Sequence, residues 1–508
     1  MSTEQKRIAV IGAGIGGLTA GIYAAKNGFD VDLYEQQGVA GGECTGWDRE
    51  GFYIDNCIHW MMGTRPGSAL NRIWRTTGML AEDTKVYRAD QMYTSEYDGE
   101  TLTLWADIDR TEREMIAHSP ADKKEIRRLM KYCRLAEDIT IPAEVPSELM
   151  SGKEGLALAG TGIKMMRIQN AYKNMNVADL AALFKSPLIG RLISDFTPGD
   201  SVASGFVTAY GNFTGGDGGV PIGGSKAAAQ RMLAEFEKAG GRYHPGTKVG
   251  KILPAGGRAS VIRLENGEEV QYDYIIPACD ASVTFGTLLP ESFMGELMKS
   301  MFADRKAYPV YNTFQTAFEV DMAEEPFDAE YNFESPELVF HEGAGPRLTV
   351  KTYGYEPDFA PAGKQILETL GGGSESLYPW WQELYQDREA YEAKKTEIAE
   401  TTRVVLEDHF PKLKGKLRLL DAWTPMTYAR YCSAYKGFYQ AFMISKDSAK
   451  LPYPPAYVEG LDNVILAGQW ISPPGGLPGA AITGKAAVQR IMNKEQMDFR
   501  LADAGFAG

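Results

Sequence analysis

The chain has 508 residues, which at ~100–200 residues per domain predicts two or three domains and a core large enough to fold without disulfides or metal. Its hydrophobic fraction of 44% and charged fraction of 24% are those of an ordinary globular protein, so wholesale disorder is excluded. The net charge of -14 repels a phosphate backbone, and we therefore expect no nucleic-acid partner.

The cysteines are scattered and form no C-x-x-C pair, which fits reduced thiols and supports neither zinc nor any other metal. They are Cys44, Cys57, Cys133, Cys279 and Cys432. Residues 1–14 run from a charged tail into a strand pattern without the apolar region of a signal peptide, so we expect a cytoplasmic protein. Residues 463–483 carry no charge, but Pro473, Pro474 and Pro478 interrupt them, which favours a strand, a loop and a helix over a membrane span.

The first predicted elements form a βαβ unit. Residues 7–13 are an apolar run that ends in glycines, and residues 18–26 have a helical pattern that stops at Gly28. Residues 31–35 then alternate like a strand.

A second region of the same kind begins near Gly223. Residues 225–241 predict a helix with Ser225 as its N-cap and a stop at the terminal pair of glycines. Strands are predicted at 247–253, 258–264 and 268–278. The last two strands are joined at Asn266-Gly267, a turn dipeptide that supplies positive φ at both central positions.

Near the C-terminus, residues 463–470 predict a strand, residues 472–479 a constrained loop and residues 480–492 a helix. The sequence therefore predicts an α/β protein whose Rossmann-type domain interleaves with a discontinuous α+β substrate domain that carries a helical lid. The Rossmann-type domain comprises residues 1–84, 206–285 and 456–500, and the substrate domain comprises residues 85–205 and 286–455.

The strongest signal is a glycine fingerprint. Gly12-Ala13-Gly14-Ile15-Gly16-Gly17 satisfies G-x-G-x-x-G directly after a predicted strand and at the start of a helix, which is the context of a dinucleotide site. Gly12 is predicted to make the tight turn, Gly14 to let the backbone approach a pyrophosphate and Gly17 to allow close packing of helix on strand. Glu35 lies 18 residues after Gly17, near the expected ~20, where a carboxylate accepts hydrogen bonds from ribose hydroxyls.

The sequence around these motifs resembles the FAD-dependent phytoene desaturase family, which includes carotenoid isomerases and retinol saturases and belongs to the amine-oxidase-like flavoproteins. The similar segments are GVAGGECTGW, GFYIDNCIHW, NVADLAALFKSPLIGRLIS, GGVPIGGSKAAAQRMLAEFEKAGGRYHPGTKVGKIL and NVILAGQWISPPGGLPGAAITGKAAVQRI. The resemblance extends over nearly the whole chain. It implies an FAD-binding fold of the glutathione-reductase and amine-oxidase kind.

By this resemblance FAD is the cofactor, with adenosine near Glu35, pyrophosphate on the fingerprint and isoalloxazine beside the C-terminal loop. The helix that follows this loop presents its positive dipole end, which would stabilise negative charge on reduced flavin. The implied cofactor-binding residues are Gly12, Gly14, Ile15, Gly16, Gly17, Glu35, Gly42, Val249, Gly468, Gln469, Gly476, Leu477, Pro478 and Gly479.

Two residues depart from the family's pattern. Glu43 follows the double glycine where many relatives carry an arginine, and because an inward carboxylate would repel a phosphate, we expect Glu43 to point elsewhere. Gln469 stands where much of the superfamily has an acid, and its uncharged amide can still hydrogen-bond a hydroxyl. Both departures bear on which subfamily the chain resembles and leave the expectation of FAD unchanged.

His59 is the one catalytic candidate. It is either an acid or base beside the flavin or a packing residue among apolar neighbours, and the sequence leaves both alternatives open. Residues 429–442 are dense in aromatics, which either line a tunnel for a long polyene or acyl chain or belong to the core. The pair Trp380 and Trp381 has the same two interpretations.

Residues 151–195 are basic in an acidic protein. Their charged residues sum to +3, with Leu, Ile, Met and Phe between them. The segment is either an interfacial helix pair at a membrane, through which a lipid enters, or an amphipathic lid on a soluble domain.

The resemblance implies an FAD-dependent oxidoreductase or isomerase that desaturates, saturates or isomerises carbon–carbon bonds of a long hydrophobic unsaturated substrate, such as a carotenoid, a retinoid or a fatty acid. Amine oxidation is one alternative. A non-catalytic prenyl-lipid carrier of the GDP-dissociation-inhibitor kind is another, because fold alone does not certify catalysis. The sequence leaves quinone, oxygen and a nicotinamide open as electron partners.

Overall fold

The computed structural model describes residues 5–324, 326–327, 330–338 and 347–499. Its βαβ unit is formed by β1 (Arg7–Ile11), α1 (Ile15–Lys26) and β2 (Asp30–Tyr34). Both strands are buried almost throughout, as expected for a parallel sheet covered on its faces. Helix α1 begins at Ile15, three residues before the start that the sequence pattern predicts. The second half of the glycine fingerprint therefore lies inside the helix.

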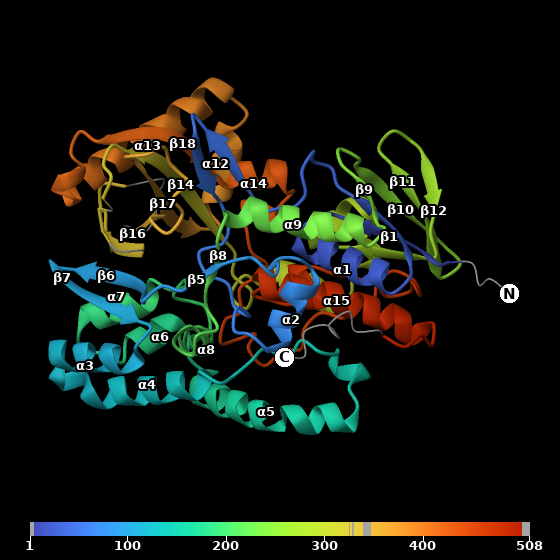
Figure 1. Cartoon of the computed structure of the whole chain (residues 1–508), viewed down its shortest axis with the longest axis horizontal. Helices are drawn as coiled ribbons and strands as arrows, with labels where there is room; N and C mark the ends of the chain where they lie inside the picture. The colour runs from blue at the N-terminus through green and yellow to red at the C-terminus, as the bar shows by residue number, and fades with distance from the viewer. Residues whose placement is uncertain (1–4, 325, 328–329, 339–346, 500–508) are drawn as a thin grey trace.

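A parallel sheet in the order β13-β1-β2-β9 is the centre of the Rossmann-type part. The remaining elements of this part are β9 (Arg242–His244), β10 (Val249–Ala255), β11 (Arg258–Leu264), β12 (Glu269–Gln271), β13 (Tyr274–Pro277), α9 (Gly224–Lys238), α10 (Ala281–Val283) and α15 (Gly476–Lys494). Strands β10, β11 and β12 form a separate antiparallel sheet beside it (Figure 1).

Further short helices and strands lie outside these two sheets. They are β3 (Gly46–Arg49), β4 (Phe52–Asp55), α2 (Ala69–Thr76), β5 (Val86–Tyr87), β8 (Val220–Pro221) and α11 (Glu296–Ala303). Strand β3 pairs with β4, and β5 pairs with β8 although the two lie far apart in sequence.

Three details of the predicted elements are wrong. Ser225 does not cap α9, because the helix begins at Gly224 and Ser225 Oγ instead accepts the Ile58 N–H at 2.9 Å. Only Gly267 has a positive φ (91°) in the predicted turn, so Asn266 does not adopt the expected conformation. The predicted strand over 268–278 is divided between two sheets, since β12 pairs with β11 and β13 pairs with β1.

The predicted strand at 463–470 is not a regular strand. Val464 forms an isolated parallel bridge with Ile275, and the Ala467 N–H donates to Pro277 O at 3.0 Å, so this segment follows β13 along the sheet. Helix α15 then begins at Gly476, four residues earlier than predicted.

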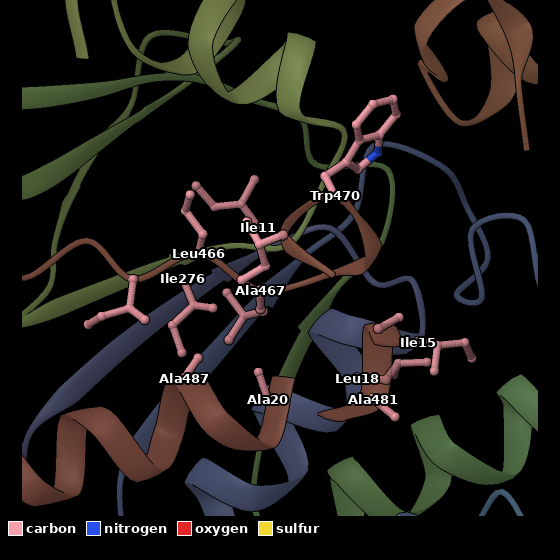
Figure 2. Packing of buried hydrophobic residues seen from close by; sticks show 14 of the residues in the cluster. Ile11, Ile15, Leu18, Ala20, Ile276, Leu466, Ala467, Trp470, Ala481 and Ala487 are labelled. Carbon is pink, nitrogen blue, oxygen red and sulfur yellow. The ribbon is translucent and has the colours of Figure 1, made fainter. Parts of the chain in front are cut away.

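Helices α1 and α15 cross against one face of the parallel sheet. A Cβ on Gly484 of α15 would lie 2.3 Å from the Gly16 carbonyl oxygen, so only small residues permit the approach. Ala20 and Ala487 lie on this crossing, below Ile11 and Ile276 (Figure 2). Residues from both ends of the chain therefore share one core.

A seven-stranded sheet in the order β18-β14-β17-β16-β15-β6-β7 forms the second part. Its strands are β6 (Gln91–Tyr97), β7 (Glu100–Trp105), β14 (Tyr311–Val320), β15 (Glu330–Glu334), β16 (Arg347–Thr352), β17 (Gln365–Ser374) and β18 (Leu417–Trp423). All neighbouring pairs are antiparallel except β15 with β6.

Helices lie on opposite sides of the second part (Figure 1). Helices α12 (Leu377–Leu384), α13 (Arg388–His409) and α14 (Pro425–Tyr431) lie at the β18 end. At the other end lie α3 (Ile108–His118), α4 (Lys123–Ala136), α5 (Gly152–Tyr172), α6 (Val177–Ala181), α7 (Pro187–Ser194) and α8 (Ala203–Thr214). The predicted boundary between residues 205 and 206 falls inside α8, which packs against α4.

Candidate functional site

The glycine fingerprint forms a tight turn between β1 and α1. Gly12 has a φ of 101°, and its N–H donates to Tyr34 O at 2.8 Å. A Cβ on Gly17 would lie 1.8 Å from the Gly12 carbonyl oxygen, so a side chain there cannot be accommodated. A Cβ on Gly14 would instead meet no atom within 4 Å. The turn is therefore closed on its packed side at Gly17 and open at Gly14.

Glu35 lies directly after β2 and is held by backbone groups. Its Oε2 accepts the Ala13 N–H at 2.8 Å, and its Oε1 accepts the Gln37 N–H at 2.9 Å. Burial raises the pKa of this carboxyl, and the backbone N–H groups oppose the shift. The carboxylate is thus fixed against the fingerprint turn, in the position expected of a group that accepts ribose hydroxyls.

A cavity of about 1130 Å³ extends from the fingerprint to the seven-stranded sheet. Among the predicted site residues, those that line it are His59, Gly12, Gly14, Ile15, Gly16, Glu35, Gly42, Val249, Gly468, Gln469, Gly476, Leu477 and Pro478. Gly17 and Gly479 lie outside the lining: Gly17 packs on the turn, and a Cβ on Gly479 would meet Ser472 O at 3.2 Å. The structure thus brings three distant chain segments to one cavity.

The C-terminal loop presents the start of α15 to this cavity. Gly476, Leu477 and Pro478 form the first residues of the helix, and its N-cap residue, Gly475, has no side chain to cap it. The Gly476 N–H donates to Gln469 Oε1 at 3.0 Å. The helix therefore directs the positive end of its dipole toward the cavity.

Glu43 points into the cavity, and the expectation that it points elsewhere is wrong. Gln469 Nε2 donates to Glu43 Oε2 at 3.2 Å, so the two residues that depart from the family pattern contact one another. Burial raises the pKa of Glu43 well above its ordinary value. The hydrogen bond from Gln469 opposes this shift, because it favours the ionised form of the carboxyl.

The residues present fit FAD. The fingerprint and the double-glycine loop leave a cradle for a flat, charged ligand, since a Cβ on Gly42 would lie 3.3 Å from the Gly14 Cα. Gly14 opens onto the cavity, Glu35 is fixed beside it, and two helix N-termini, those of α1 and α15, face it. These residues would hold the adenosine and pyrophosphate at one end and the flavin at the other.

The cavity lining includes a set of large apolar side chains, called here the apolar wall: Trp60, Met61, Met62, Met92, Phe196 and Leu370. Polar side chains of the seven-stranded sheet, among them Gln315, Glu330 and Thr349, also line the cavity. His59 lines it too, and its Nδ1 lies 3.5 Å from Glu330 Oε2, at the start of β15. Of the two interpretations of His59, the structure places it at the cavity rather than within the packed core.

The aromatic segment 429–442 divides between cavity and core. Tyr431 and Tyr439 line the cavity. Tyr435, Phe438 and Phe442 instead pack against other rings, for example Phe442 against Trp470 at 4.9 Å between ring centroids. Trp381 belongs to the core, where its ring stacks on Phe314 at 5.8 Å between centroids, and the partly buried Trp380 packs against this cluster.

Several cavity residues could not be identified from the sequence. Glu330 and Gln315 line the cavity from strands, Tyr428 from helix α14 and Asp280 from the N-cap of α10, and none of these segments carries a motif. Gln315 Nε2 donates to Tyr428 OH at 2.7 Å, and that hydroxyl donates to Asn56 Oδ1 at 2.8 Å. Packing between segments that are far apart in sequence brings these side chains together, and one sequence does not reveal such packing. In the part of the chain that the structure describes, no group of three His, Cys, Asp or Glu side chains could hold a metal ion.

The fold and the site define a Rossmann-type, FAD-dependent oxidoreductase. Residues 15–492 match the family described as flavin containing amine oxidoreductase, and the chain belongs to that family. It is 22% identical to 4,4'-diaponeurosporene oxygenase of Staphylococcus aureus, over 96% of this chain and 99% of that protein. It is 24% identical to a lycopene-forming phytoene desaturase of a Paracoccus species, over 97% and 98%.

The solved structures share the architecture. Cyclohexylamine oxidase of Brevibacterium oxydans is 13% identical, has a TM-score of 0.60, and the likeness covers 97% of this chain and 100% of that one. The predicted α/β fold and the FAD cofactor are confirmed. Family membership also makes the protein an enzyme, so the alternative of a non-catalytic lipid carrier has no support.

Proposed function

We propose that this flavoenzyme acts on carbon–carbon bonds of a long hydrophobic unsaturated substrate, by desaturation, saturation or double-bond isomerisation. The observation that carries the proposal is one cavity whose lining includes both the glycine fingerprint and the large apolar side chains of the apolar wall. Its volume of about 1130 Å³ exceeds the ~300–1,000 Å³ of a site for one drug-sized ligand, which leaves room for a second molecule beside FAD.

The curated relatives that cover nearly the whole chain support a polyene. By their names, these relatives are an oxygenase of diaponeurosporene and a desaturase that forms lycopene. The apolar wall matches such a chain, because aromatic and methionine side chains bury extended apolar surface without a polar partner. The likeness to solved amine oxidases supports the fold and not an amine substrate.

FAD supplies two-electron chemistry by hydride transfer. The chain's own residues would exclude water with the apolar wall and exchange the accompanying proton at His59. In a desaturation one substrate carbon loses a hydride and its neighbour loses a proton, and the His59 imidazole would accept that proton. Glu330, 3.5 Å from His59 Nδ1, would orient the ring.

The test is anaerobic incubation of the FAD-loaded protein with polyenes and unsaturated fatty acids, followed by mass and chromatographic analysis. A gain or loss of two hydrogens with a matching change in flavin redox state identifies a saturase or desaturase. An unchanged mass with a shifted retention identifies an isomerase. The same incubation in air detects insertion of oxygen into the substrate. Reduction of the flavin by amines, and by none of the unsaturated compounds, would contradict the proposal.

Met62 offers a matched pair of variants for this assay. Its side chain is on the apolar wall. Met62→Lys places a charge there and is expected to abolish turnover while FAD content is kept, because an isolated buried ammonium is costly beside an apolar chain. Met62→Leu, which conserves volume, is expected to keep turnover. Equal activity of both variants would locate the substrate elsewhere.

We further propose peripheral contact with an anionic lipid surface through residues 151–195. Leu156, Ile163 and Met166 lie on the outward face of α5, with 78%, 54% and 56% of their surface exposed. Lys153 and Arg167 flank them, so this face combines apolar and basic groups as interfacial helices do. No helix among the described residues is long and apolar enough to cross a membrane.

Co-flotation with vesicles tests this contact. Binding to anionic vesicles is expected, with weaker binding to neutral ones and loss on replacing Leu156, Ile163 and Met166 by Glu. Val404→Glu is the matched control, since Val404 is also exposed but lies on α13. Absence of flotation, or equal loss with the control, overturns the proposal.

A further inference from the structure

Four of the five cysteines lie at the flavin cavity. Cys44, Cys57, Cys279 and Cys432 line it, whereas Cys133 is buried in α4 among the helices of the second part. The structure describes all five, and each is a free thiol. The reaction proposed above uses none of these thiols, although sulfur chemistry beside a flavin is a route for electrons.

The hairpin of β3 and β4 brings Cys44 opposite Cys57. The two strands are antiparallel, and their pairing continues one residue beyond them, where the Asn56 N–H donates to Thr45 O at 3.1 Å. Continued by one more residue, this register sets Cys44 opposite Cys57, at a pair without backbone hydrogen bonds. Such pairs have Cα atoms about 4.5 Å apart, within the ~4.4–6.8 Å that a disulfide spans.

Contacts to Ser225 of α9 hold both cysteines in place. The Cys44 thiol donates to Ser225 O at 3.6 Å, and the N–H of Ile58, the residue after Cys57, donates to Ser225 Oγ at 2.9 Å. The thiols of Cys44 and Cys57 interact, and this interaction together with burial raises the pKa of Cys57. The register, the shared contact to Ser225 and the thiol interaction therefore place these two sulfur atoms beside one another.

The two thiols differ in access. Cys44 is 2% exposed, whereas Cys57 is only partly buried, and both line the cavity. A small reagent in the cavity therefore reaches Cys57 first, and Cys44 lies behind it.

We propose that Cys44 and Cys57 form a redox-active dithiol in the wall of the flavin cavity, which a small-molecule disulfide converts reversibly into a protein disulfide. The Cys57 thiolate attacks one sulfur of the small disulfide, forms a mixed disulfide and expels one thiol. Cys44 then attacks the Cys57 sulfur, closes the Cys44–Cys57 bond and expels the second thiol. The two cysteines lose two electrons in total, and the small disulfide is reduced to two thiols that carry the two protons.

The bond would join two segments of the cavity wall. Glu43 precedes Cys44 and His59 follows Cys57 by two residues, and both of these side chains line the cavity. The disulfide would restrict the movement of these two segments relative to one another. Intracellular disulfides that form transiently are commonly catalytic or redox-sensing. Oxidation of this pair does not depend on which substrate the cavity takes.

Tryptic mapping after incubation with oxidised glutathione tests the pair. Trypsin cleaves after Arg49, so Cys44 and Cys57 fall in separate peptides that a disulfide would join. The incubation is run at about pH 9, because a raised pKa leaves little Cys57 thiolate at neutral pH. FAD-loaded protein and apoprotein, treated in parallel, should yield the joined peptides in at least one of the two, and dithiothreitol should separate them again. Joined peptides in neither, or a bond from Cys57 to Cys432 instead, would overturn the proposal.

Serine variants test the order of attack. Cys44→Ser should stop at a mixed disulfide of Cys57 with one glutathione, whereas Cys57→Ser should take up no glutathione at the buried Cys44. Cys432→Ser is the matched control, since Cys432 also lines the cavity, and it should still yield the joined peptides. Circular dichroism establishes that each variant is folded. Loss of the joined peptides in folded Cys432→Ser, or glutathione on Cys44 in Cys57→Ser, would contradict the assignment.

Discussion

Glu330 and Lys351 are cross-strand neighbours on β15 and β16, and only one of them reaches the cavity. Glu330 lines it beside His59, whereas Lys351 is 7% exposed and its Nζ has no hydrogen-bond partner within the described structure. Glu368 is the next cross-strand neighbour of Lys351, on β17. A row of charged side chains therefore lies in the sheet directly behind the catalytic candidate.

Two hydrogen bonds hold the carboxyl group of Glu368, the last side chain of this row. Tyr353 OH donates to its Oε2 at 2.7 Å, and the Asp55 N–H donates to its Oε1 at 2.9 Å. Burial raises the pKa of Glu368 to about 8 and lowers that of Lys351. Lys351 thus lies among more carboxyl groups than one ammonium could neutralise, and burial favours the protonated form of Glu368.

The first prediction concerns pH and stability. Since the pKa of Glu368 is raised from its value in the unfolded chain, its contribution to stability is present at acidic pH and is lost as pH rises toward about 8. We expect the free energy of unfolding to fall by about 1–3 kcal/mol over this pH range, which lowers Tm by a few degrees. Glu368→Gln should remove this fall. Thermal melting at about pH 5 and about pH 8 with saturating FAD measures it. Glu268→Gln, at an exposed turn, is the control and should melt like the wild type. If the Tm of Glu368→Gln changes with pH as much as the Tm of the wild type does, Glu368 does not have this role.

The second prediction concerns proton transfer at the substrate end. His59→Gln should lower kcat by about 10²–10⁴-fold, the range for loss of a positioned acid or base, with FAD content unchanged. Glu330→Gln should lower kcat by less, about tenfold, because it removes only the group that orients His59. Steady-state kinetics at several pH values separates kcat from KM. Full activity in His59→Gln would return this residue to a packing role.

The third prediction separates binding from folding within the fingerprint. Gly14→Val directs a branched side chain into open cavity space, so the protein should fold but lose its FAD. Gly17→Ala places a methyl group 1.8 Å from the Gly12 carbonyl oxygen and should prevent folding or lower Tm strongly. Flavin absorbance per protein and circular dichroism distinguish the outcomes. Wild-type flavin content in folded Gly14→Val would overturn the assignment of this turn.

The parts of this site that the sequence predicts are local ones. The fingerprint, the first helix and Glu35 lie close together in sequence. The backbone geometry that this motif requires is enough to predict their roles. The C-terminal loop was identified through a family resemblance, and its helix dipole gives that resemblance a physical basis. In each case neighbouring residues in sequence are neighbours in space.

The remaining parts depend on long-range packing. Glu330 meets His59 because β15 pairs with β16 in one register, and no local pattern encodes that register. Glu43 points inward because Gln469 from the far end of the chain offers it a donor. The strand predicted over 268–278 divides after Gln271 because its two halves have different partners. A single sequence does not specify such partners, and the inward position of Glu43 shows that an expectation based on charge alone fails when a distant side chain supplies a hydrogen bond.

The fourth prediction concerns Glu35, whose two oxygens each accept a backbone N–H. Glu35→Gln leaves one oxygen to serve two donors and turns an amide N–H₂ toward the other, so one buried N–H loses its partner at a cost of about 1–3 kcal/mol. We expect about tenfold weaker FAD binding and a lower Tm, measured by FAD titration and thermal melting. Glu35→Asp keeps the charge but withdraws it from the Ala13 N–H, and it should bind FAD more weakly than the wild type. If both variants bind FAD with wild-type affinity, Glu35 does not contribute to cofactor binding and only stabilises the fingerprint turn.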